Sequence, residues 1–221
     1  DRLDIVSMSL GGGGNPDDPS SRAIDNIVNA GVIAVIAAGN NGPFEQSVAS
    51  PGNARSAITV GAIDKGMEIA EFSSRGLVVW EDSTGEVKYL NKPDILAPGV
   101  AICAAQWETA WEYAECFDDE HTAISGTSMA TPMVSGAIAI LKQSSPDKTP
   151  SEIKSLLMST ADDLEYDATL QGAGMLNLPR ALSNSKERGD ILVTIGDNLI
   201  VNEESIINLT FRNNNPKKIN K

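Results

Sequence analysis

Short, almost continuously apolar runs alternate with turn-rich stretches over the first hundred residues. Residues 32–38 and 57–63 consist largely of Ile, Val and Ala, and residues 4–10 contain Ile, Val, Met and Leu; glycine or polar residues follow each run. Runs of this length without alternating polar positions are typical of strands buried on both faces, as in a parallel sheet. Residues 92–99 form a further extended, turn-bounded segment.

A helix is expected between the first two of these strands. Ile24, Ile27 and Val28 have the spacing of one helical face. Ser20 or Ser21 precedes this face and is expected to cap the helix, while a glycine at position 31 suits its end. A helix that joins two parallel strands predicts a right-handed crossover.

Two more helices are expected in the second half of the chain. Residues 129–141 are apolar nearly all round, which predicts a helix buried in the centre of a domain. Residues 149–152 read Thr-Pro-Ser-Glu, a capping box with proline at the first helical position. The buried stripe of that helix is expected to be Ile153, Leu156 and Leu157.

The composition changes after about residue 185. The segments 191–195, 199–201 and 206–211 are rich in β-branched residues and separated by turn residues, which predicts the first strands of an all-β module. We therefore divide the chain into an α/β part, 1–186, and the beginning of a β-rich domain, 187–221. The chain opens directly on a strand and closes directly after one, so we interpret it as a piece of a longer protein.

The net charge of the chain argues against some classes of binding partner. The 221 residues include 17 Lys and Arg against 30 Asp and Glu, which gives a net charge of −13. An acidic chain is a poor partner for nucleic acid or for anionic lipid, because both require a basic face. No apolar run approaches the length of about 20 residues that a transmembrane helix needs. The single histidine, His121, excludes a site built from several histidines.

Candidate chemistry lies in three polar segments that follow buried elements: residues 9–12, 38–40 and 125–132. An open parallel sheet places its site beyond the carboxyl ends of its strands. Ser128 opens the apolar helix, where the positive end of the helix dipole would stabilise negative charge. A serine in this place is also an ordinary helix cap. An α/β-hydrolase nucleophile elbow is excluded, because that fold needs a histidine after the serine.

The segment GTSMATP, residues 126–132, resembles the active-site serine motif of the subtilisin-like serine proteases. Further matches follow the family's order along the chain: SLGG at 9–12, AAGN at 37–40, VGA at 60–62, FSSRG at 72–76, KPDILAPG at 92–99 and GAGMLN at 172–177. The resemblance covers the C-terminal half of such a catalytic domain. It implies a three-layer α/β fold with a mostly parallel sheet, truncated at its N-terminus.

The resemblance also implies roles for individual residues. Ser128 matches the acylating nucleophile, and Asn40 matches the side chain that, with the N–H of Ser128, donates to the tetrahedral oxyanion. The positions that match the substrate-binding segments are Ser9, Leu10, Gly11, Gly12, Ala38, Gly39 and Ala49. An extended polypeptide would pair with the first of these segments as an added strand. The peptide bond between Ser50 and Pro51 is expected to be cis.

The family's aspartate and histidine lie before the region that this chain matches, and their motifs are absent. His121 lies seven positions before Ser128, up to about 23 Å away if the stretch is extended, so we interpret it as a solvated side chain. The predicted function is that of a serine endopeptidase whose Asp and His come from an absent N-terminal segment. The alternatives are a pseudoprotease that binds peptides without cutting them, and a purely structural fragment.

Two further features of the sequence allow more than one interpretation. The two cysteines, Cys103 and Cys116, are compatible with a disulfide or with two free thiols. Three aromatic residues in the same stretch could cover a substrate subsite, although packing onto the domain is favoured: Trp107, Trp111 and Tyr113.

The expected partners and location follow from the resemblance. The chemistry needs no cofactor and no metal, and we interpret the acidic runs as solvated loops, although many subtilases bind structural calcium. The partners are a polypeptide substrate and either the missing N-terminal half or a second copy of the chain. The family implies an extracellular or cell-surface protein.

Overall fold

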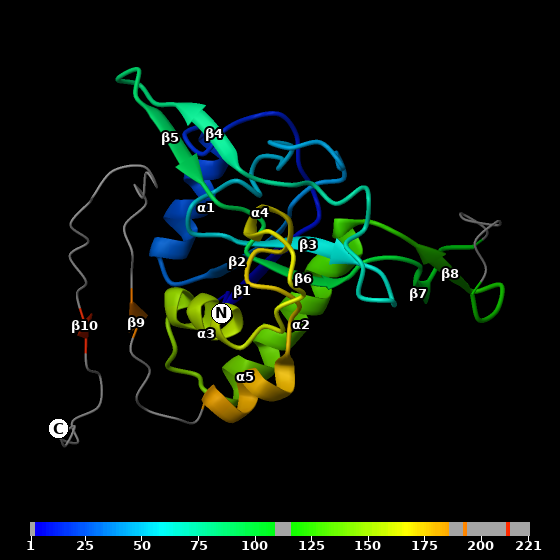
Figure 1. The fold of residues 1–221 in the computed structure, drawn as a ribbon. Helices are drawn as coiled ribbons and strands as arrows, with labels where there is room; N and C mark the ends of the chain where they lie inside the picture. Colours follow the sequence, from blue (N-terminus) through cyan, green and yellow to red (C-terminus); the bar gives the residue numbers. More distant parts are fainter. Residues whose placement is uncertain (1–2, 109–115, 186–191, 194–210, 213–221) are drawn as a thin grey trace.

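The computed structural model describes residues 3–108, 116–185, 192–193 and 211–212. Its centre is a four-stranded parallel sheet in the order β1-β2-β3-β6 (Figure 1). The strands are β1 (Ile5–Met8), β2 (Ile33–Ala37), β3 (Ile58–Ile63) and β6 (Ile95–Pro98). The predicted α/β fold with a mostly parallel sheet is confirmed.

The side chains of β2 alternate between two apolar cores. Ile33 and Val35 belong to a larger core, which contains side chains of three helices. Ala34 and Ile36 belong to a smaller core that includes Ile24 of the crossover helix. Successive side chains of a strand point to opposite faces, so a sheet covered on both sides leaves no polar position in β2.

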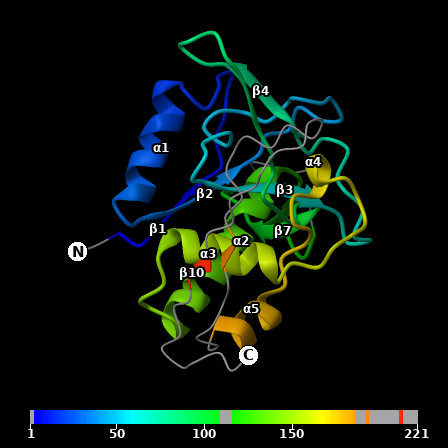
Figure 2. The same ribbon diagram turned by 60° about the vertical axis from the view of Figure 1, so that its left-hand side comes forward.

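Figure 2 shows the crossover helix α1 on one side of the sheet and the helices of the larger core on the other. The helices are α1 (Pro19–Asn29), α2 (Thr127–Ser144), α3 (Pro150–Ser159), the short α4 (Ala168–Gln171) and α5 (Leu178–Ser185). The capping box and the buried stripe predicted for α3 are both confirmed.

The cap of α1 differs from the prediction. Asp18 is the N-cap, and its carboxylate accepts a hydrogen bond of 2.8 Å from the N–H of Ser21. The expectation that Ser20 or Ser21 caps this helix is wrong: Pro19 suits the first helical position, so the cap is Asp18, two residues before Ser20. Gly31, in the left-handed region at φ 96°, follows the end of the helix as expected.

Helix α2 is not buried all round, contrary to the prediction. Val134 and Ile138 are fully buried against the sheet, whereas Met133 and Ile140 are 42% and 46% exposed. Side chains three and four positions apart share a face, so one face of α2 packs on the sheet and the opposite one carries an apolar strip. We call this strip the outer face of α2: Pro132, Met133, Gly136, Ala139 and Ile140.

A largely buried charged cluster lies at the start of β6. The carboxylate of Asp94 contacts Lys92 at 2.7 Å and Lys154 of α3 at 2.8 Å, and both ammonium groups donate to the carbonyl of Ala57. Burial alone would raise the pKa of Asp94, but Lys154 and Lys92 hold it below its usual range. Burial lowers the pKa of Lys92 to about 7. The cluster joins β6 to α3.

Two antiparallel hairpins leave the body of the molecule. One pairs β4 (Val78–Glu81) with β5 (Val87–Leu90), and the other pairs β7 (Ile102–Ala105) with β8 (His121–Ile124).

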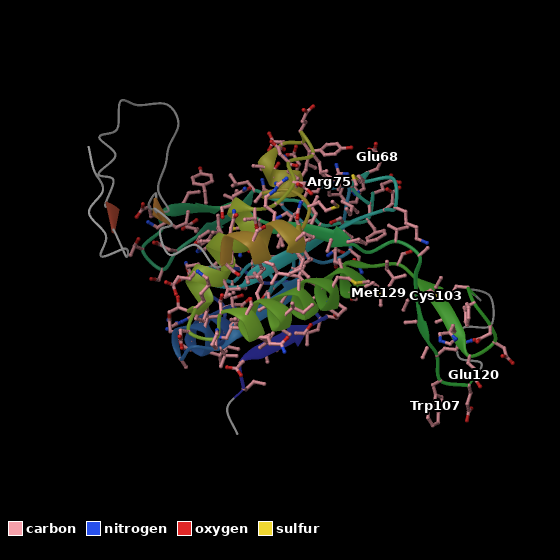
Figure 3. The ribbon with its side chains drawn as sticks, turned by 90° about the horizontal axis from the view of Figure 1, so that it is seen from below. Glu68, Arg75, Cys103, Trp107, Glu120 and Met129 are labelled. Carbon is pink, nitrogen blue, oxygen red and sulfur yellow. A yellow bond between two sulfur atoms is a disulfide. The ribbon has the colours of Figure 1, made fainter. Side chains whose placement is uncertain are left out.

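Figure 3 shows the β7–β8 hairpin extending away from Met129, with Trp107 and Glu120 toward its far end. Cys103 and Cys116 form a disulfide. Trp107 is 79% exposed, so the expectation that it packs onto the domain is wrong. Trp111 and Tyr113 lie outside the described residues.

Only two short strands are described in the C-terminal region. β9 (Leu192–Val193) pairs antiparallel with β10 (Phe211–Arg212). The other residues of 187–221 lie outside the described part of the chain, so the domain boundary and the all-β module stay predictions. Among the described helices, none is long and apolar enough to cross a membrane.

Candidate active site

Three of the polar segments meet at one end of the sheet. Ser9 follows β1, and its hydroxyl donates to the carbonyl oxygen of Ser128 at 2.9 Å. Asn40 follows β2, and its side-chain oxygen accepts from the backbone N–H of Thr127 at 2.9 Å. The structure therefore brings Ser9, Asn40 and Ser128 together from positions far apart in the sequence.

Ser128 is the second residue of α2. The N-cap is Gly126, and no side-chain hydrogen bond caps this described helix, so Ser128 does not serve as its cap. The residue is partly exposed and lies beside the free backbone N–H groups of a long helix. A Cβ on Gly126 would come within 3.4 Å of Asn40 Nδ2, so a glycine here keeps the space beside the amide open.

Thr127 orients the amide of Asn40. Both the N–H and the hydroxyl of Thr127 donate to Asn40 Oδ1 at 2.9 Å, and the hydroxyl accepts from the N–H of Gly39 at 3.2 Å. Because Oδ1 receives two donors, the NH₂ group of Asn40 is turned away from Thr127 and can donate elsewhere. This role was not predicted: Thr127 stands inside the serine motif, but nothing in its position in the sequence identifies it as the partner of Asn40.

The predicted substrate segment is joined to the segment that follows Asn40. We call residues 11–14 the glycine loop and residues 48–53 the pocket segment. Gly12 and Ser50 exchange backbone hydrogen bonds of 2.8 and 2.9 Å. A Cβ on Gly11 would lie 2.8 Å from the methyl group of Ala49. The cis bond expected between Ser50 and Pro51 is present.

Ala38, Gly39 and Ala49 form a second contact next to the first. The N–H of Ala49 donates to the carbonyl of Ala38 at 2.9 Å. Gly39 has φ 107°, and a Cβ there would lie 2.9 Å from Ser74 Oγ and 3.1 Å from the Ala49 methyl group. Ala49 therefore lies between the glycine loop and Gly39, and both neighbours need glycine for this close approach.

His121 belongs to the β7–β8 hairpin. It pairs with Ala105 on β7, and its ring Nδ1 lies 2.5 Å from Asp118 Oδ1. This hydrogen bond holds the pKa of the Asp118 carboxyl below its usual value. The interpretation of His121 as a solvated, noncatalytic side chain stays a prediction. Among the described residues, no group of three or more His, Cys, Asp and Glu side chains is arranged to hold a metal ion.

Comparisons with known proteins agree with this geometry. The profile of the subtilase family matches residues 1–175. The serine protease AprX of Bacillus subtilis is 38% identical over 192 residues, which cover 79% of this chain. Subtilisin DY of Bacillus licheniformis is 31% identical over 183 residues and 81% of this chain. The chain spans only 42% and 57% of the lengths of these two relatives.

Solved structures give the same result. A protease of Pseudoalteromonas arctica superposes with a TM-score of 0.62 and 29% identity. The match covers 83% of this chain and 51% of that protease. The motif residues, the parallel sheet and the family match agree, and the chain belongs to the subtilase family.

Proposed function

We propose that this chain carries the nucleophile and the oxyanion donors of a serine endopeptidase. Its membership of the family supports a serine peptidase. The observation that carries the finer proposal is the arrangement of Ser128 at the start of α2 beside Asn40, whose amide is oriented by Thr127. The catalytic Asp and His come from an N-terminal segment outside this chain.

The proposed reaction proceeds in two steps. The hydroxyl oxygen of Ser128 attacks the carbonyl carbon of the substrate, and its proton passes to the histidine base. The resulting oxyanion accepts hydrogen bonds from Asn40 Nδ2 and the N–H of Ser128. The amine then leaves with the proton from the histidine, and a water molecule hydrolyses the ester that remains on Ser128.

An extended polypeptide is the proposed substrate. Ser9 and Leu10 are exposed, and the backbone of the glycine loop runs beside the pocket segment. A substrate strand that pairs with residues 9–12 would place its carbonyl near Ser128, since Ser9 contacts that residue directly. Ala38, Gly39 and Ala49 would form the wall of the pocket for the side chain before the cleaved bond.

The proposed partner of the chain is the N-terminal half of its own catalytic domain. Within the described residues, β1 pairs with β2 on one side and with no strand on the other. A free strand edge and an exposed apolar surface both favour association. The outer face of α2 supplies such a surface, and α2 is bonded to β1 through Ser135 and Ser7. One added segment could cover both.

The location proposed is extracellular or at the cell surface. The disulfide between Cys103 and Cys116 supports this proposal, because disulfides persist mainly in oxidising compartments.

Reconstitution tests the proposal. The isolated chain is expected to leave a fluorogenic peptide uncut, because it brings no base to Ser128. Adding the N-terminal segment is expected to restore hydrolysis, and Ser128→Ala is expected to abolish it. Hydrolysis that survives Ser128→Ala would contradict the proposal. Peptide binding without hydrolysis in the reconstituted protein would favour the pseudoprotease.

A further inference from the structure

The glycine loop and the pocket segment, which are proposed to hold the substrate, are joined through side-chain hydrogen bonds as well. The hydroxyl of Ser50 shares hydrogen bonds with those of Ser20 at 2.8 Å and Ser21 at 3.0 Å. Ser21 also donates to Asn53 Oδ1 at 2.7 Å, and Asn53 Nδ2 donates to the carbonyl of Gly14 at 3.1 Å. Ser21, Ser50 and Asn53 are buried. The glycine loop and the pocket segment therefore form one unit.

The β4–β5 hairpin contacts this unit from outside. The indole N–H of Trp80 donates to Asp17 Oδ2 at 2.7 Å. Asp17 lies three positions after the end of the glycine loop. Val78, Trp80 and Leu90 of the hairpin pack on Val48, the first residue of the pocket segment. The hairpin thus contacts the chain beside the glycine loop through a hydrogen bond, and the pocket segment through apolar contact.

Arg55 completes this connection. Its guanidinium contacts Asp17 Oδ1 at 2.7 Å and donates to the carbonyl of Pro16 at 2.8 Å. The same group lies 5.0 Å from the centre of the Trp80 ring. Asp17 therefore receives a donor from Arg55 on one oxygen and from Trp80 on the other, which fixes the position of the chain just after the glycine loop.

We propose that the β4–β5 hairpin is a brace that holds the glycine loop and the pocket segment in register, with Trp80 and Asp17 as positioning residues for substrate binding. This inference rests on the proposed function. Ser128 and Asn40 take their positions from α2 and Thr127, whereas the brace contacts the segments that hold the peptide. Loosening the brace therefore raises KM and leaves kcat near its original value.

Two variants test the brace in the whole protease, with a fluorogenic Ala-Ala-Ala-Ala substrate. Trp80→Phe keeps an aromatic ring and removes the N–H donor, and Asp17→Ala removes the acceptor from a partly exposed loop position. Trp80→Phe is expected to raise KM about three- to tenfold, the effect of losing one charge-assisted hydrogen bond. Asp17→Ala, which also removes the acceptor of Arg55, is expected to raise KM at least as much. The double variant is expected to bind no more weakly than Asp17→Ala alone, because that variant already removes the contact that Trp80→Phe removes.

The controls separate the brace from general stability and from the proposed function. Tyr89→Phe, on the exposed side of β5, is expected to leave KM unchanged. An unchanged KM in both test variants would overturn the brace, as would an equal loss of kcat and kcat/KM. If the unsubstituted protein cuts nothing, the proposed function fails. The brace is then tested by the Kd of a fluorescein-labelled Ala-Ala-Ala-Ala peptide, which both variants must raise.

Discussion

Asn40 can act as an oxyanion donor only if its amide is held in one orientation. The N–H and hydroxyl of Thr127 impose that orientation by occupying Oδ1, and both bonds are 2.9 Å long. In the proposed reaction this donor is already aligned before charge develops. Thr127 therefore acts in this proposal through its hydrogen bonds to Asn40.

Thr127→Val is therefore expected to lower kcat/KM about fivefold, since one neutral hydrogen bond that orients Asn40 is lost. Thr127→Ser keeps the hydroxyl and is the matched control, with near-normal activity. The effect of Thr127→Val should vanish in an Asn40→Ala background. Steady-state kinetics of these variants and of the unsubstituted protein measure this, and equal losses in both backgrounds would show that Thr127 acts in another way.

Asp94 supplies the carboxylate that pairs with the ammonium groups of Lys92 and Lys154. Asp94→Asn leaves the ammonium groups of Lys92 and Lys154 without their carboxylate, and is expected to lower the free energy of unfolding by about 3–5 kcal/mol. Lys88→Met breaks partly exposed pairs with Glu86 and Asp82 and is expected to change the free energy of unfolding far less, because water screens these pairs. Denaturant titrations compare the two. Similar losses for both variants would contradict a special role for the buried cluster.

The start of α1 depends on an ionised cap. Partial burial alone would raise the pKa of Asp18, but hydrogen bonds from Ser20, Ser21 and neighbouring groups lower it to about 2. The unfolded chain has the ordinary value near 4. The folded state therefore gains stability from Asp18 above about pH 4, and loses that contribution as the pH falls toward 2.

Asp18→Asn tests this, because asparagine caps helices about as well but does not titrate. The wild-type chain is expected to exceed the variant in unfolding free energy by about 1 kcal/mol at pH 6, a value reduced by solvent screening, and the difference should close by pH 2. Glu81→Gln, at the exposed end of β4, controls for the loss of one negative charge. A difference that is independent of pH would refute the role of the carboxylate.

In the described part of the chain, β1 has one edge that pairs with no strand and α2 has an exposed apolar face, and a hydrogen bond between Ser7 and Ser135 joins the two elements. If the proposed N-terminal half covers them, Met133→Glu should weaken its binding about tenfold or more, because a charge would be buried without a partner. Ser183→Glu, on the exposed side of α5, is the control. Size-exclusion chromatography with light scattering measures the complex. Equal binding by both variants would place the interface elsewhere.

The sequence alone was sufficient to predict features that depend on residues near one another in the chain. The largely apolar runs at 32–38 and 57–63 predicted the buried strands β2 and β3, because a strand covered on both faces has few polar positions. The strand predicted at 4–10 was also expected to be buried, but β1 is only partly buried. The Thr-Pro-Ser-Glu segment predicted the start of α3, since a capping box is made by residues three positions apart. Ser128 and Asn40 became candidates through motifs whose residues are close together in the sequence.

Tertiary structure decided everything that depends on distant neighbours. The pattern of residues 129–141 could not show that Met133 and Ile140 are exposed. An apolar side chain on a helix is buried only if another element packs against that face, and the sequence of the helix does not specify this. Thr127 could be assigned to Asn40 only once the end of β2 and the start of α2 came into contact. The link from Trp80 to Asp17 spans 63 positions, and a hydrogen bond between side chains that far apart leaves no periodic trace in the sequence.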